Sequence, residues 1–118
     1  MNDQDFKDFN YNILGAGSRV SGDLLLSGDA IINSQIEGSI EVLQSGKLVI
    51  ERGSFIKGKI KAFDLEIFGT VEGTIQCSGT VSIRSSAQVY GEISSAQLVI
   101  YPGAIVEMKA TSQEVAPL

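Results

Sequence analysis

The sequence predicts an all-β protein, a single-stranded parallel β-helix (β-solenoid) of about six short coils. The first observation behind this prediction is a motif, apolar-x-Gly-x-apolar, that recurs every 15 to 20 residues. The second is a short alternating apolar segment between successive motifs. Such a spacing is too short for a strand-helix-strand unit and is typical of one solenoid coil. The complete motifs begin at Val20, Ile36, Ile56, Val71 and Val89, and a degraded copy begins at Val106.

Each motif predicts a strand with one apolar face. Side chains alternate between the two faces of a strand, so the apolar residues of a motif, and the residue two positions beyond it, point toward the core. The segments between motifs, such as Leu48-x-Ile50, predict a second strand in each coil. Leu14 precedes the first motif by six residues, the interval that separates Ile50 from Ile56. The repeats therefore begin near Asn12.

The central glycines of the motifs form one column when the coils are stacked. We interpret the missing Cβ as room for Leu and Ile side chains of the opposite wall to cross a narrow core. The wider backbone freedom of glycine is a competing explanation. The column consists of Gly22, Gly38, Gly58, Gly73 and Gly91.

Stacking the motifs also aligns charged residues on the outer face. The predicted charge ladder places Glu37, Lys57 and Glu72 side by side, and Glu41 beside Lys61. Stacked strands lie about 4.8 Å apart, and a lateral pair of opposite charges contributes roughly 0.2–1 kcal/mol. The alternation Lys57, Lys59, Lys61 puts three lysines on one outer strand. Because glutamates flank them, a solvated charge ladder is favoured over a strip that binds phosphate or lipid headgroups.

The composition excludes several classes of function. The chain has 118 residues, a net charge of −5, one cysteine and no histidine. Without histidine, a Ser-His-Asp triad and His-ligated zinc are excluded. Glu37 and Glu41 could form a carboxylate pair for polysaccharide hydrolysis, but they are expected on a flat face opposite lysines, without a concave pocket. We therefore predict a protein that is not an enzyme and uses no cofactor or metal. The acidic charge argues against nucleic acid as a partner. Cys77 falls at an inward position, and we interpret it as a small buried apolar residue.

The repeats divide the chain into a single domain and two ends. We predict a flexible N-terminal arm at residues 1–11, the β-helix at residues 12–110 and a flexible C-terminal tail at residues 111–118, because the two ends are polar and lack the repeat. The sequence contains neither an apolar run of about 18–20 residues nor a signal peptide, which predicts a cytoplasmic protein.

The serial motifs, preceded by the segment ILGAGSRVSGDL at residues 13–24, resemble the bactofilins, polymer-forming cytoskeletal proteins of bacteria. The resemblance covers about residues 12 to 110. It implies a right-handed β-helix that assembles end to end into filaments without nucleotide, often beside the inner membrane. It also implies roles in cell shape and in placing cell-wall enzymes. Expected partners are therefore further copies of the chain, cell-wall enzymes and membrane proteins. Many bactofilins carry an apolar or basic membrane anchor, whereas the aspartates among the first eight residues here argue against direct membrane binding.

The two ends of the predicted solenoid are the expected polymer interface. A terminal coil exposes unpaired backbone groups and the open end of the core, and no segment has the pattern of a cap. The expected interface residues are Leu14, Val20, Leu24 and Leu26 at one end, and Ile105, Val106 and Met108 at the other. The alternative function is a non-polymerising binding module that presents an aromatic surface to a protein or glycan, formed by Phe55, Phe63, Phe68 and Tyr90.

Overall fold

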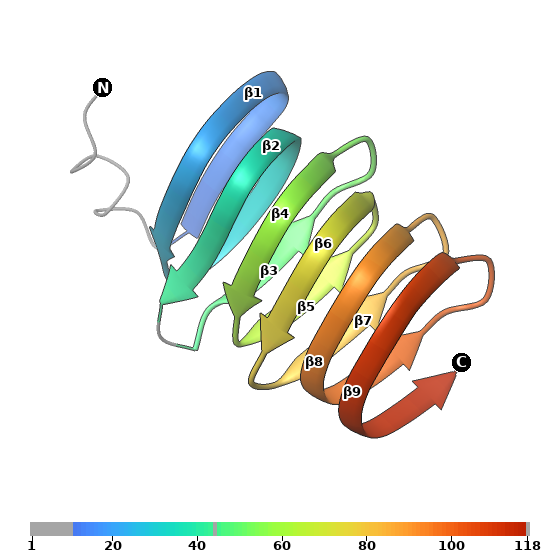
Figure 1. The fold of residues 1–118 in the computed structure, drawn as a ribbon. Helices are drawn as coiled ribbons and strands as arrows, with labels where there is room; N and C mark the ends of the chain where they lie inside the picture. Colours follow the sequence, from blue (N-terminus) through green and yellow to red (C-terminus); the bar gives the residue numbers. More distant parts are fainter. Residues whose placement is uncertain (1–10, 44, 118) are drawn as a thin grey trace.

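The computed structural model describes residues 11–43 and 45–117, and the side chains of residues 19–43 and 45–111. Within these residues every regular element is a β-strand, and the strands pair in parallel to form one right-handed coil after another (Figure 1). The strands are β1 (Tyr11–Ser27), β2 (Asp29–Leu43), β3 (Lys47–Ile50), β4 (Phe55–Ala62), β5 (Asp64–Ile67), β6 (Thr70–Cys77), β7 (Thr80–Ile83), β8 (Gln88–Ile100) and β9 (Ile105–Pro117). The predicted all-β parallel solenoid is confirmed.

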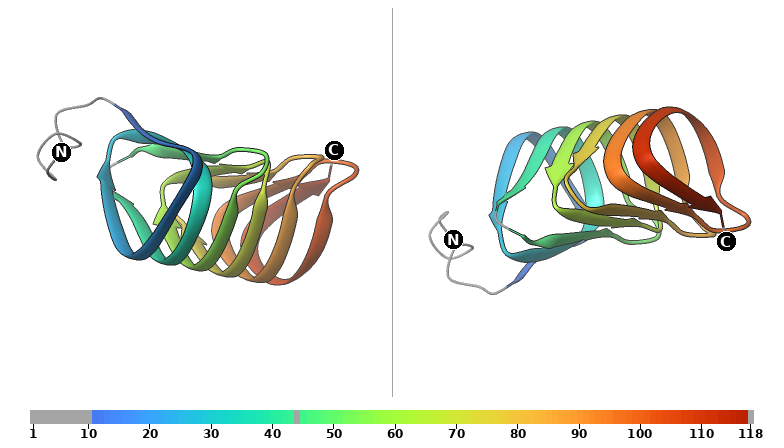
Figure 2. Two further views of the ribbon diagram at one scale, coloured as in Figure 1. Left: turned by 90° about the horizontal axis from the view of Figure 1, so that it is seen from above. Right: turned by 90° about the horizontal axis from the view of Figure 1, so that it is seen from below.

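The register of the strands follows the sequence motif. In successive coils Val20 pairs with Ile36, Ile36 with Ile56 and Ile56 with Val71, and the same alignment continues through β8 to β9. The short strands β3, β5 and β7 form a second stack, which β2 and β8 join through their own short-strand segments. Figure 2 shows the coils stacked along one axis, with the first and last coils at opposite ends.

The core is a set of apolar columns that run through the stack. The fully buried side chains come from alternate positions of both stacks, as the period of two requires. Such columns give each side chain neighbours of similar shape in the coils above and below. Its largest members are Ile32, Ile36, Ile40, Leu48, Ile50, Ile56, Ile60, Leu65, Ile67, Ile75, Ile83 and Ile93.

The glycine column serves the backbone and not the core, so our interpretation of the missing Cβ was wrong. Gly38, Gly58 and Gly73 are only partly buried, and their φ angles are +138°, +140° and +136°. A Cβ on Gly38 would overlap the carbonyl oxygen of Gly22 in the preceding coil, and a Cβ on Gly58 would overlap that of Gly38. Glycine is required because this backbone conformation directs the Cβ position along the stack, where the strand of the preceding coil already lies.

Hydrogen bonds at the corners tie each coil to the previous one. The backbone N–H groups of Phe68, Arg84 and Tyr101 donate to the carbonyl oxygens of Ile50, Ile67 and Ile83 at 2.7–2.9 Å. At a second corner, Oδ1 of Asp29 accepts from the N–H of Lys47, and Oδ1 of Asp64 accepts from the N–H of Thr80, both at 2.9 Å. These bonds satisfy polar groups that the turns would otherwise leave unpaired.

The C-terminal boundary differs from the one expected at Ala110. Strand β9 continues to Pro117, and its second half pairs with β8 through Val115 beside Leu98 and Pro117 beside Ile100. Residues 111–114 are polar, so the apolar pattern does not predict this part of the strand. Val115 nevertheless follows Leu98 at the 17-residue spacing that separates Val89 from Val106. At the other end β1 begins at Tyr11, and the predicted arm otherwise falls outside the described residues.

Candidate functional site

Both ends of the solenoid present an open strand edge. Among residues 11–43 and 45–117, β1 pairs with β2 alone and β9 pairs with β8 alone, whereas every strand between them has a neighbour on each side. A parallel edge of this kind exposes a row of N–H and C=O groups, which is a template for pairing with another chain. Within these residues, the two ends are therefore the part of the fold where a whole strand edge lacks backbone hydrogen-bond partners.

At the N-terminal end the core is only partly covered. Val20 and Leu24 pack against the core but keep part of their side chains exposed, whereas their counterparts one coil further in, Ile36 and Ile40, are each 1% exposed. Leu26 is already buried within the chain. Leu14 pairs with Ile32 through the backbone, and its side chain lies outside the described side chains.

The C-terminal end has the same character. Val106 and Met108 pack against the core and are half-buried, and Ile100 and Ala104 beside them are also partly exposed. Met108 stands where the other coils have a glycine, paired with Gly91. Ile105 differs from the other predicted interface residues, because its side chain is 50% exposed and points outward from the strand. It lies at the rim of this end and not over the core.

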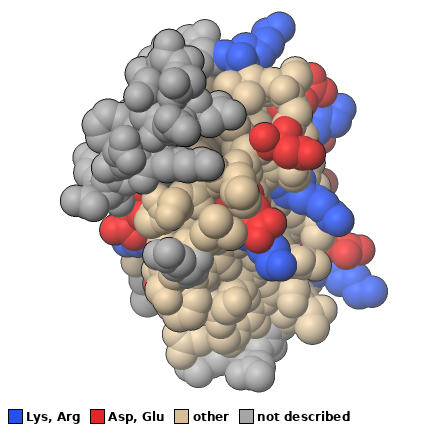
Figure 3. Space-filling model, turned by 90° about the vertical axis from the view of Figure 1, so that its left-hand side faces the viewer, with Lys and Arg blue, Asp and Glu red and all other residues tan. Residues whose placement is uncertain are grey.

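The outer face of the long strands carries the predicted charge ladder. The register places Glu37 beside Lys57, Lys57 beside Glu72 and Glu41 beside Lys61. Viewed from the first coil, most of the visible Lys, Arg, Asp and Glu side chains lie toward one side of the molecule (Figure 3). Among the described side chains, however, the ion pairs are Lys47–Glu66 at 2.7 Å and Arg84–Glu66 at 3.5 Å. The ladder residues are lateral neighbours without closed ion pairs.

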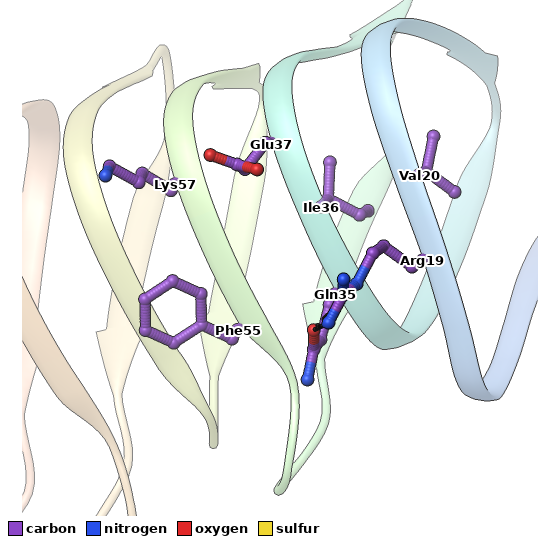
Figure 4. Close-up of a pocket in the computed structure, with 7 residues that line it drawn as sticks. All are labelled: Arg19, Val20, Gln35, Ile36, Glu37, Phe55 and Lys57. Atoms are coloured by element: carbon purple, nitrogen blue, oxygen red, sulfur yellow. Dashed lines mark hydrogen bonds between the residues drawn. The ribbon is translucent and has the colours of Figure 1, made fainter.

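A hollow of about 290 Å³ lies on this face over the first three coils. Arg19, Gln35 and Phe55 line it in adjacent coils, with Glu37 and Lys57 beside them (Figure 4). Nε and Nη2 of Arg19 both donate to Oε1 of Gln35, at 3.2 and 3.0 Å. The lining of the hollow thus combines two cations, a carboxylate, an amide and an aromatic ring.

A cluster on the short-strand side was not identified from the sequence. The guanidinium of Arg84 lies 4.1 Å from the ring centre of Tyr101 and 5.3 Å from that of Phe68, and it also hydrogen-bonds to the hydroxyl of Tyr101 at 3.1 Å. Glu66 joins the cluster by pairing with both Arg84 and Lys47. The positions of these residues in the repeat could have predicted the cluster. Each of the three comes directly after the last residue of a short-strand segment, so they stack in one column: Phe68, Arg84 and Tyr101.

The described residues offer no site for a metal. They contain no group of three or more His, Cys, Asp or Glu side chains that could hold an ion. Cys77 is buried, and desolvation by that burial raises its pKa from the ordinary 9.0 to about 12. A thiol with so little thiolate at neutral pH is a poor nucleophile and metal ligand. None of the described residues forms a helix that could cross a bilayer.

The fold and its ends define a class, the structural repeat proteins whose terminal coils are open to further strands. The family model for bactofilins, described as polymer-forming cytoskeletal, matches residues 12–111, so the chain belongs to the bactofilin family. It is 26% identical over 92 residues to Bactofilin BacO of Myxococcus xanthus (strain DK1622), an alignment that covers 78% of this chain and 71% of that protein. No solved structure matches the chain.

Proposed function

We propose that the protein assembles end to end into filaments without nucleotide, and that these filaments act as a scaffold for proteins of cell shape or cell-wall synthesis. One structural observation carries the proposal. Within the described residues, the first and last coils each have one strand edge without a partner and one incompletely covered end of the core. Membership of a polymer-forming cytoskeletal family supports the same function.

Stacking a further copy on each end satisfies both unused features together. The new strand supplies partners for the backbone N–H and C=O groups of the edge, and its inward side chains cover the exposed parts of Val20 and Leu24 at one end and of Val106 and Met108 at the other. Each large apolar side chain that becomes fully buried contributes up to about 1.5–3 kcal/mol. The joint therefore uses the same interactions that hold successive coils together within the chain.

The outer face supplies a charge match at the rims of the joint. The outward residues of β1 include Arg19 and Asp23, and those of β9 include Glu107 and Lys109, so the long-strand part of each terminal coil carries one residue of each sign. Opposite charges can meet whichever two ends join. The charge pattern therefore leaves the polarity of the filament to experiment, while the proposal assigns the joint to the two terminal coils.

The proposed assembly needs no energy input, because it follows from edge pairing and burial alone. Purified protein should sediment as a polymer and appear as filaments in negative-stain micrographs, with no ATP or GTP and in the presence of EDTA. A small oligomer at every protein and salt concentration would contradict the proposal. A requirement for nucleotide or a divalent metal would also contradict it.

The aromatic binding module is less well supported. Phe68 lies against the Arg84 guanidinium, and the hydroxyl of Tyr90 hydrogen-bonds to Gln88 at 3.1 Å. Phe55 lies in β4 on the long-strand stack, while Phe68 follows β5 of the short-strand stack. The aromatic residues are therefore divided between stacks. Partner proteins, cytoplasmic filaments and association with the inner membrane through those partners remain part of the proposed scaffold function.

A further inference from the structure

We propose that Gly22 belongs to the filament joint at the first coil, where its missing Cβ leaves room for the backbone of the joining strand. The inference rests on the proposed end-to-end assembly and adds a residue to its joint. Gly22 lies in β1, the strand that forms the first coil at one end of the stack (Figure 1). The other glycines of the column instead face coils of their own chain.

The glycine column has a direction along the stack. A Cβ on Gly38, Gly58, Gly73 or Gly91 would overlap the carbonyl oxygen of the column glycine one coil earlier. For each of the four, the three nearest atoms all belong to that preceding glycine. Their φ angles, between +126° and +140°, repeat the same geometry in every coil. The Cβ position of each column glycine therefore points toward the N-terminal end of the solenoid.

Gly22 repeats this geometry at the open end of the stack. Its φ is +119°, and the register pairs it with Gly38 as it pairs Gly38 with Gly58. The Cβ position of Gly22 therefore points away from β2 and out of the first coil. No atom of the described residues lies within 4 Å of that position, and the residue is exposed. An alanine here would meet the strain of its φ but no overlap with the described part of its own chain.

A joining strand would occupy the space in front of Gly22. Hydrogen-bonded strands lie about 4.8 Å apart, and at the strand spacing within the solenoid the Cβ position of each inner column glycine already overlaps a carbonyl group. A strand that pairs with β1 at this spacing brings its own backbone to the same place. A Cβ at position 22 would then push that strand away and break the backbone hydrogen bonds of the joint, whichever end of the second copy supplies the strand.

The last coil does not share this constraint. Met108 takes the place of the column glycine and pairs with Gly91, so the direction of the column leads from this end back into the chain. The two ends thus differ in one property: the edge of the first coil needs a residue without a Cβ, whereas the edge of the last coil carries a side chain at the same position. Gly22→Ala should therefore block one end of the chain and leave the other able to join.

Sedimentation of the full chain carrying Gly22→Ala tests the inference. We expect a folded protein with an unchanged β-signal that forms a monomer, or a dimer joined through its last coils, in place of filaments. The matched control is Gly53→Ala, at an exposed corner away from both ends. Gly53 has a φ of +90°, and only Oδ1 of Asn33 lies near its Cβ position, at 4.0 Å. This control carries backbone strain without a contact to the joint, so it should lower the denaturant midpoint by a similar amount and keep the filaments.

Mixing the variant with wild-type protein distinguishes a blocked end from a general loss of structure. Because its last coil is intact, a small fraction of Gly22→Ala chains should add to growing wild-type filaments and stop them, which shortens the filaments severalfold in negative-stain micrographs. A chain that carries both Gly22→Ala and Met108→Arg has neither end able to join and should leave the length unchanged.

Three results would overturn the role of Gly22 and leave the proposed assembly standing. They are filaments of wild-type length from Gly22→Ala alone, wild-type filaments that the variant does not shorten, and a Gly22→Ala chain that unfolds where Gly53→Ala stays folded. The last result would mean that Gly22 serves its own coil and not the joint. The absence of filaments from the wild-type chain would instead overturn both the proposed assembly and this inference.

Discussion

A Cβ atom on Gly58 would overlap the carbonyl oxygen of Gly38, the residue that occupies the same position one coil earlier. The overlap arises because φ at Gly58 is +140°, which directs the Cβ position along the stack. Gly22 has a similar φ of +119° but belongs to the first coil, and no atom of the described residues lies within 4 Å of its Cβ position. Substitutions at these two glycines therefore distinguish the effect of steric overlap from the effect of backbone strain.

Gly58→Ala should lower the free energy of unfolding by several kcal/mol, because it adds a backbone clash to the strain of about 1–3 kcal/mol expected for a side chain at such a φ. In a chain that has not joined another copy at its first coil, Gly22→Ala carries the strain alone and should cost less. Denaturant titration of both variants, followed by circular dichroism at one protein concentration, measures the difference. Equal losses in the two variants would show that the neighbouring coil is not the constraint.

The charge ladder should contribute little to stability, since its residues are exposed or partly exposed neighbours without closed ion pairs. Lys57→Glu places three glutamates in adjacent coils and should cost a few tenths to about 1 kcal/mol. Adding Glu37→Lys and Glu72→Lys restores alternation and should recover the loss, an outcome measured by the same titration at low salt. If the effects of the three substitutions on the free energy of unfolding are simply additive, then Glu37, Lys57 and Glu72 do not interact across the coils.

The Arg84 cluster should matter more than the ladder. Arg84→Ala removes the contact with the Tyr101 ring, the hydrogen bond to its hydroxyl and the ion pair with Glu66, and we expect a loss of roughly 1–3 kcal/mol. Arg84→Lys keeps the charge without the planar stack and should retain only part of the stability. A double-mutant cycle with Tyr101→Leu checks the pairing, and a coupling energy near zero would show that the stack contributes nothing.

Cys77 should be nearly inert to thiol reagents in the folded protein. Because burial raises its pKa from 9.0 to about 12, the thiolate fraction at pH 8 falls on the order of a thousandfold. Alkylation by iodoacetamide should be slower by about this factor in native than in denatured protein. The unfolded state loses this proton first, so stability should fall as pH rises from about 9 toward 12. Rapid labelling without unfolding would contradict the buried position.

Much of this fold could be predicted because each coil repeats the same alternation of inward and outward residues. Aligning the motifs predicts that Ile36 lies beside Ile56 and Glu37 beside Lys57, and the structure has these same pairs in the register of β2 and β4. The role of the glycines could not be decided in this way, since a pattern of residues does not reveal the sign of φ at Gly38 or the direction of its absent Cβ.

The sequence predicts the structure least well where a segment departs from the repeat, and where side chains of different coils contact one another. The second half of β9 keeps the spacing of the motif but little of its apolar character, so Val115 was assigned to a tail. Ile105 is one of the predicted interface residues, and its position in the strand, beside Gln88, directs its side chain outward. The Arg84 stack required knowledge of the corner geometry, which the alternation of apolar residues does not encode.

The proposed joint is tested most directly by Met108→Arg, because Met108 lies in the last coil, half-buried beside the open end of the core. A charge there stays hydrated in a single chain but must be desolvated in a joint, at a cost of several kcal/mol. Gln76→Arg adds the same charge at an exposed outward position of β6 and is the control. Sedimentation and negative-stain microscopy should find filaments for wild type and Gln76→Arg, and a folded monomer or small oligomer with unchanged β-signal for Met108→Arg. Filaments of Met108→Arg at wild-type concentrations would show that this end is not the joint.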